Sequence, residues 1–315
     1  MDVSGAVSEP FAQLSAFHIA FNRNVKLSFG ALEAIGKIAL GPDGLLRLPT
    51  GGEPWGTTTS WRSLDQPVKN AATFLSELGI VRATAAFEDY LVLAKAEFDR
   101  AKLVPVRGFG MGTAVLDHLD GLLGINPADI DITARMATFF DVARNCAVHR
   151  SNRASPQLAA LRAEPAFTAT LAAWPRRVGR WTVSLPPIQE GTAIDWRPRH
   201  AIMASDAYLR CARIIDRALV ACLGEIGLVR MAAHWSFFAD VLTPCPAKLD
   251  AATIVRTQLI DRHRVRAPTT AQVIQGLRDA EMWDPVLRAF ERVYPDGPET
   301  AGPRRRRARL RRRVR

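Results

Sequence analysis

The chain has 315 residues, of which 48% are hydrophobic and 23% charged, a composition typical of a globular protein rather than a disordered or fibrous one. Its formal net charge is +11, but nine arginines between residues 304 and 315 supply most of it, so the body of the chain is nearly neutral. The four cysteines lack zinc-binding or disulfide spacing, which predicts a cytoplasmic protein. No apolar run reaches the ~20 residues of a membrane span, so no membrane contact is expected.

The first part of the chain is expected to be helical with one long loop. Apolar residues at helical spacing predict one or two helices over 10–39. Residues 42–63 are rich in Gly, Pro and Thr and are expected to form a loop. The proline-free stretch 71–101 predicts one long helix or two helices joined at Gly79, and a short helix is expected over 113–123.

An amphipathic helix is expected to start at Pro127 and to run to about His149. Its apolar residues recur at intervals of mostly three or four and form a core stripe centred near Met136 and Ala143. At about 100° per residue, Asn145 and His149 lie more than ~120° from this stripe. They are four residues apart and therefore share one face of the helix, away from the intramolecular core.

The second part of the chain is also expected to be mainly helical. Residues 181–199 include two consecutive prolines and short β-prone pieces, which predicts an irregular connection or a small β-hairpin. A helix is expected over 201–224, and further helices over 225–293 are interrupted by prolines. The fold class is therefore predicted to be all-α with a small irregular or hairpin insertion.

The most informative stretch is Arg144-Asn145-Cys146-Ala147-Val148-His149, which places a fixed cation, an amide and an imidazole within two helical turns. An Arg followed at this distance by a His arises about twice by chance in a chain of this composition, so the spacing alone is weak. The second such pair, Arg256 and His263, lacks the amide after the arginine and lies among further arginines. We expect it to be structural, or part of a basic surface that binds phosphate.

Residues 144–149 resemble the signature of the HEPN superfamily (higher eukaryotes and prokaryotes nucleotide-binding domain), an all-helical group with many RNases of toxin, abortive-infection and antiviral systems. That signature is an Arg, usually followed by Asn, Asp or His, and then a His after four to six intervening residues at the end of a core helix. Residues 85–91, Ala-Ala-Phe-Glu-Asp-Tyr-Leu, also resemble the aromatic-acidic element of the family's first long helix. The likeness covers about 66–224 and implies a HEPN-like helical bundle.

The resemblance implies a metal-independent endoribonuclease. Histidine can exchange protons near neutral pH, so His149 would act as general acid or base. The guanidinium of Arg144 would stabilise the phosphate and the transition state, and Asn145 would orient either His149 or the phosphate. Because one motif supplies one imidazole, the family's usual arrangement of two motifs facing one cleft predicts a homodimer.

Other residues are expected to support this site. Glu88, Arg150 and Asn152 are candidates, although a surface ion pair or a helix contact is the competing interpretation for Glu88. The tail arginines Arg304, Arg305, Arg306 and Arg307 are expected to bind RNA. No metal or cofactor is expected, and the remaining histidines His18, His118, His200 and His234 are expected to be structural.

The predicted organisation has four parts: N-terminal helices and loop (1–65), a HEPN-like core (66–224), a C-terminal helical extension (225–298) and a disordered tail (299–315). The expected partners are RNA, a second copy of the chain and an antitoxin or defence-system protein. Two alternatives stay open. One is a non-catalytic HEPN-like module that binds RNA or a protein through the same face, and the other is a toxin whose motif is modified by its antitoxin.

Overall fold

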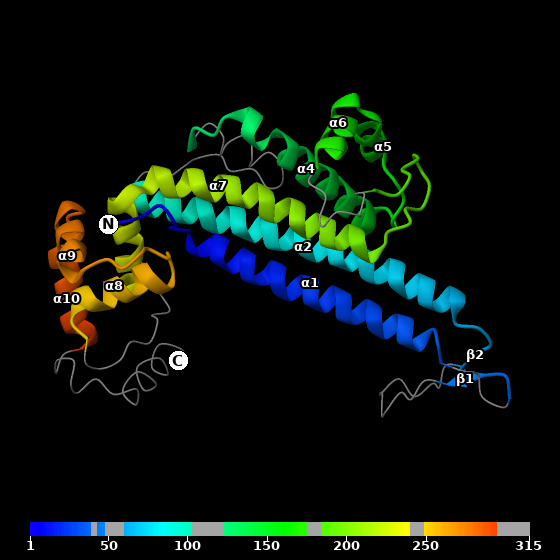
Figure 1. The fold of residues 1–315 in the computed structure, drawn as a ribbon, viewed down its shortest axis with the longest axis horizontal. Coiled ribbons are helices and arrows are strands. Elements are labelled where there is room, and N and C mark those ends of the chain that lie inside the picture. The colour runs from blue at the N-terminus through cyan, green and yellow to red at the C-terminus, as the bar shows by residue number, and fades with distance from the viewer. Residues whose placement is uncertain (39–42, 48–59, 103–122, 175–183, 240–248, 295–315) are drawn as a thin grey trace.

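The computed structural model describes residues 1–38, 43–47, 60–102, 123–174, 184–239 and 249–294, which are almost entirely helical (Figure 1). The predicted all-α class is confirmed. The helices are α1 (Glu9–Ile35), α2 (Asp65–Lys102), α4 (Pro127–His149), α5 (Pro156–Ala163), α6 (Pro165–Ala173), α7 (Pro198–Ala233), the π-helix η1 (His234–Phe238), α8 (Ala251–Asp261), α9 (Thr270–Asp279) and α10 (Trp283–Val293). No helix among these residues is long and apolar enough to cross a membrane.

Three long helices form the centre of the molecule. α2 packs along α7, and α1 packs against both of them (Figure 1). α4 lies across α2 and α7 on another side and carries α5 and α6, while α8, α9 and α10 gather at one end around η1 and the last part of α7. Buried side chains from all of these helices join one hydrophobic core, so burial of apolar surface holds the two sides of the central layer together.

Several predicted boundaries need correction. The segment 42–63, expected to be a loop, contributes two short antiparallel strands, β1 (Leu46–Arg47) and β2 (Ser60–Trp61). The helices over 225–293 are interrupted not only near prolines but also at Glu281, whose positive φ of 57° separates α9 from α10. The helix expected over 113–123 lies outside the described residues except for its last position.

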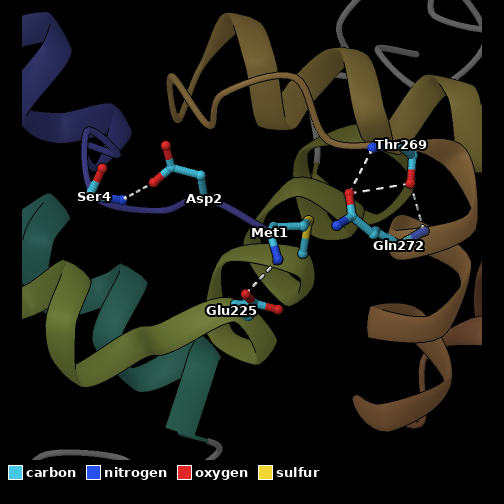
Figure 2. Close-up of polar contacts among 6 residues, drawn as sticks. All are labelled: Met1, Asp2, Ser4, Glu225, Thr269 and Gln272. Atoms are coloured by element: carbon cyan, nitrogen blue, oxygen red, sulfur yellow. Dashed lines mark hydrogen bonds and ion pairs between the residues drawn. The ribbon is translucent and has the colours of Figure 1, made fainter.

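Local capping chemistry explains where the helices begin. The Asn126 side chain accepts a hydrogen bond from the backbone of Ala128, and Pro127 occupies the first turn, where its missing N–H costs nothing. Thr269 and Gln272 form a reciprocal capping box at the start of α9 (Figure 2). Thr269 therefore fixes the first residue of α9 at Thr270.

α2 is one continuous helix rather than two helices joined at Gly79. Its glycine permits close packing: a Cβ placed there would lie 2.8 Å from the Cβ of Ala201 in α7. That separation is too short for two carbon atoms, and the atom in the way belongs to a short, rigid side chain. Gly79 therefore sets how closely the two central helices approach each other.

We expect Gly79→Ala to destabilise the protein by about 1 kcal/mol. Overpacking the contact with Ala201 costs about 1–3 kcal/mol, and the higher helix propensity of alanine offsets about 1 kcal/mol of this cost. Gly30→Ala in α1 is the matched control, since no atom lies within 4 Å of its added Cβ, and it should stabilise by roughly 0.5–1 kcal/mol. Urea unfolding monitored by circular dichroism measures both changes. Stabilisation of equal size by both variants would contradict the close contact.

α7 changes direction at Gly224, where φ is 58° and ψ is −168°. Only glycine adopts this conformation readily, so the kink depends on this residue. The helix expected to end at 224 in fact continues to Ala233, and its second part packs against α8 and α9. The amino group of Met1 lies 2.5 Å from Glu225 Oε1 just after the kink (Figure 2).

A carboxyl group is buried where α1, α2 and α7 meet. Glu97 in α2 is only 1% exposed, and its carboxyl group lies beside the side chain of Trp235 in η1. Burial, together with the charges of Asp216 and Glu9, raises the pKa of Glu97 to about 8, against the opposing effects of the Trp235 side chain and the charge of Arg100. Asp216 is better accommodated because its Oδ1 accepts a hydrogen bond of 3.0 Å from the backbone N–H of Ser8.

This carboxyl should make the protein less stable in alkaline solution. The carboxyl group of Glu97 has a pKa of about 4.5 in the unfolded chain, so below this pH it is protonated in both the folded and the unfolded protein. Between about pH 4.5 and about pH 8 it is protonated only in the folded protein, and the free energy of unfolding therefore falls as the pH rises. Glu97→Gln should stabilise the protein little at pH 5 and by roughly 3–5 kcal/mol at pH 9. Thermal unfolding across this range measures the gain, with the exposed Glu33→Gln as control; a pH-independent difference would contradict the prediction.

Candidate functional site

The two faces of α4 are arranged as the apolar spacing predicts. Met136, Phe139 and Phe140 are completely buried, whereas Asn145 and His149 are exposed. Aromatic contacts fix the buried face: Phe139 stacks on Phe167 of α6 at 4.9 Å between ring centroids, and Phe140 packs against Trp196. The polar end of the motif therefore lies on a rigid helix and faces away from the core.

Arg144 forms the centre of a small polar cluster. It forms an ion pair with Glu88 of α2 through Nη2, and its Nη1 donates a 2.9 Å hydrogen bond to Oδ1 of Asn145. The side chains of the ion pair are 24% and 29% exposed, so solvent reaches both. The structure thus brings Glu88 to the motif, in the ion-pair geometry that was the competing interpretation for this residue.

An additional carboxyl group, which the sequence analysis did not single out, lies beside Arg144. Asp141 precedes it by three residues and so occupies the same side of α4. Partial burial raises the pKa of Asp141, the positive charge of Arg144 opposes this rise, and Glu88 adds to it. Arg144 is therefore flanked by two carboxyl groups, one from its own helix and one from α2.

Buried aromatic contacts hold Glu88 in place. Its neighbour Phe87 stacks on Tyr208 of α7 at 4.8 Å, and the Tyr208 hydroxyl lies 2.8 Å from Thr84 Oγ1. Tyr90 donates a hydrogen bond of 3.0 Å from its hydroxyl to the carbonyl of Ala212. These contacts fix α2 against α7 and thus place the carboxylate of Glu88 over α4.

His149 is the last residue of α4, and its side chain is exposed. Among the described residues, no hydrogen bond or ion pair joins it to Arg144 or Asn145. It follows Asn145 by one helical turn, so the two side chains share a face, as predicted. One copy of the chain thus presents the arginine, the amide and the imidazole along a single exposed edge.

Arg150 and Asn152 belong to a turn that ends α4, and the structure separates their roles. Ser151 and Asn152 have positive φ values of 48° and 61°, and the backbone N–H groups of Arg150 and Asn152 both donate to the Cys146 carbonyl. Asn152 is buried, and its side-chain amide donates a 2.8 Å hydrogen bond to the carbonyl of Ile194. Asn152 therefore anchors the segment before α7, whereas Arg150 is exposed beside His149.

The second Arg–His pair lies in a different setting. His263 is fully buried, with its Nδ1 3.3 Å from the carbonyl of Val7, and burial lowers its pKa to about 4. Arg256 donates a 2.5 Å hydrogen bond from Nε to the carbonyl of Pro268. This histidine connects the N-terminal segment to the end of α8 and is not part of a phosphate-binding surface. The tail residues Arg304, Arg305, Arg306 and Arg307 lie outside the described residues.

The other described histidines have neighbours inside the fold. Nδ1 of His18 lies 2.9 Å from Ser205 Oγ. His200 accepts a hydrogen bond from the Arg197 backbone at the start of α7, and burial lowers its pKa to about 4. The ring of His234 packs edge-on against Trp235. His118 lies outside the described residues.

Within the described ranges, no three His, Cys, Asp or Glu side chains come together in a group that could hold a metal ion. Comparison of the chain with protein-family models, with curated proteins and with solved structures gave no match. The family assignment therefore stays a prediction that rests on the motif and its helical context.

Proposed function

We propose that the chain is a metal-independent endoribonuclease of the HEPN type, acting in the cytoplasm as a toxin or an anti-phage effector, alone or with an antitoxin or defence partner. The observation that carries this proposal is the exposed edge of α4, where Arg144, Asn145 and His149 lie within two turns on a helix that is otherwise anchored by buried aromatic side chains. A guanidinium, an amide and an imidazole in this order suit phosphodiester chemistry.

The proposed reaction is transfer of a phosphoryl group within the RNA strand. One imidazole accepts the proton of the ribose 2′-hydroxyl, whose oxygen attacks phosphorus as the bond to the 5′-oxygen breaks. A second imidazole protonates that leaving oxygen, which gives a 2′,3′-cyclic phosphate and a 5′-hydroxyl end. Negative charge builds on the phosphoryl oxygens in the transition state, where the guanidinium of Arg144 would stabilise it.

The requirement for two imidazoles supports a composite site between two copies of the chain. Apolar residues flank the Arg144–Glu88 pair on the exposed surface: Val148, one turn beyond Arg144, is 51% exposed, and Val92, one turn beyond Glu88, is 58% exposed. A second copy related by a twofold axis would cover these side chains and bring its own His149 to the same cleft.

A second candidate function is a non-catalytic module that binds RNA or a protein through the same edge. The ion pair between Glu88 and Arg144 favours this alternative, because the carboxylate occupies part of the guanidinium that a phosphate would need. Two of the five N–H donors of an arginine serve Glu88 and Asn145 here, so a phosphate would have to share or displace these contacts.

Incubation of the purified protein with RNA in EDTA tests the proposal. We expect cleavage without added metal and products that end in a 2′,3′-cyclic phosphate. Cleavage that requires Mg²⁺ would contradict the mechanism, and binding of RNA without cleavage would favour the non-catalytic module.

A further inference from the structure

A short extended segment runs beside the turn that follows the motif. Residues 191–194 pair with residues 152–154 through backbone hydrogen bonds, and Arg153 forms an antiparallel bridge with Ala193. Burial alternates along the segment: Ile194 and Trp196 face the core, whereas 193, 195 and 197 are exposed. Bridged residues point to the same side of a β-pair, so Arg153 lies on the same outer face as Asp195 and Arg197.

Four exposed arginines lie in the turn after α4 and at the start of α7. Arg150 and Arg153 come from the turn and Arg197 and Arg199 from the start of α7, and all four are exposed. The segments that hold them, 150–154 and 184–199, contain two acidic residues, Asp195 and Glu190. The net charge of the two segments is therefore +2, directly beyond His149. We call these four residues the arginine ridge.

We propose that the arginine ridge binds the phosphate backbone of an RNA strand that passes through the His149 site. The inference rests on the proposed function, because it takes RNA as the ligand of that site. Arginine binds phosphate through parallel N–H donors, and a row of arginines would guide consecutive phosphates toward the imidazole. The ridge begins at the residue next to His149, so a bound strand would run on from the cleavage position without a break.

The contacts that the ridge makes within the chain are weak enough to be exchanged for phosphate. Arg197 pairs with Asp195 at 3.0 Å, but the two side chains are 59% and 45% exposed, and exposed pairs contribute little to stability. Arg153 donates one hydrogen bond, to the Gly191 carbonyl, and Arg199 donates one of 3.3 Å from Nε to Nε2 of His200. Arg150 has no ion-pair or hydrogen-bond partner for its side chain within the described ranges. A phosphate can therefore bind without unfolding the segment.

The ridge should recognise phosphates and not bases. Sequence-tolerant binding by stacking needs exposed aromatic rings, and base reading needs side chains that reach base edges. Within residues 150–154 and 184–199, the one aromatic ring is that of Trp196, which is 1% exposed. The ridge would therefore bind RNA of different sequences with similar strength.

The test measures RNA binding by the full-length His149→Ala protein, so that cleavage cannot interfere. In this background, Arg153→Gln with Arg197→Gln should weaken binding of single-stranded oligo(U) and oligo(A) about tenfold at low salt. The slope of log affinity against log salt should become smaller by about 1.4, because two phosphate contacts are lost. Fluorescence anisotropy across a salt series gives both quantities.

The matched control removes the same charge far from the site. Arg278→Gln with Arg288→Gln changes two exposed arginines of α9 and α10, at the opposite end of the molecule, and should leave affinity and slope nearly unchanged (Figure 1). Circular dichroism confirms that each variant is folded. Arg150→Gln with Arg199→Gln gives a second ridge variant with the same expected loss.

Three outcomes would overturn the inference: unchanged binding by both ridge variants, an equal loss in the control, or a loss restricted to one base. The result is separable from the proposed function. Cleavage by the wild-type chain with ridge-independent binding rejects the ridge alone. Ridge-dependent binding without any cleavage by the wild type rejects the ribonuclease and keeps the ridge.

Discussion

Replacement of His149 by alanine is expected to lower the rate of RNA cleavage by roughly 10²–10⁴-fold, the usual contribution of a general acid or base. The loss should arise in the chemical step, since His149 is exposed at the end of α4 and its side chain forms no hydrogen bond or ion pair within the described residues. Single-turnover cleavage of a labelled RNA in EDTA measures the rate. Thermal unfolding should show a melting temperature close to that of the wild type.

Variants of the polar cluster separate this chemical role from a structural one. Arg144→Ala should also abolish cleavage, but it leaves Glu88 and Asp141 without their shared cation and should therefore destabilise the protein by about 1 kcal/mol. Arg278→Ala, an exposed arginine of α9, serves as the control and should retain full activity. Cleavage that survives both His149→Ala and Arg144→Ala would remove these residues from the mechanism.

The core side of α4 could be predicted because its cause is local. Apolar residues three and four positions apart must face one side of a helix, so the burial of Met136 and the exposure of Asn145 follow from spacing alone. The long length of α2 was foreseen for the same reason. The same spacing left open whether α2 continues through Gly79, because the reason for that glycine is Ala201, a neighbour in space from a distant helix.

The contacts of the site depend on long-range packing and were harder to foresee. Glu88 and Arg144 are 56 residues apart in the chain. Only the resemblance of residues 85–91 and 144–149 to two elements of the HEPN superfamily suggested that they meet. Asn152 follows the motif closely in sequence, yet its left-handed backbone turns the side chain inward to Ile194. Asp141 could have been found from its position three residues before Arg144 on the same helix.

The composite site predicts a disproportionate loss of activity when inactive subunits are mixed with wild type. A ninefold excess of His149→Ala chains leaves about one wild-type pair in a hundred if subunits exchange at random and each active site needs two wild-type copies. Activity per wild-type chain should then fall about tenfold, because nearly every wild-type subunit is paired with an inactive one. The measurement is cleavage at constant wild-type concentration after the subunits have been allowed to exchange.

The control replaces the inactive chain by one that should not pair. Val92→Arg with Val148→Arg, added to His149→Ala, places charges on the two apolar side chains that flank the Arg144–Glu88 pair, and charges are unfavourable in the centre of an interface. This triple variant should be monomeric in sedimentation and should leave wild-type activity unchanged at the same excess. Activity that stays constant with both additives would mean that each chain cleaves RNA alone, and the second imidazole would then have to come from elsewhere in the same chain. An equal loss with both additives would instead indicate competition for RNA and would reject the twofold interface at α2 and α4.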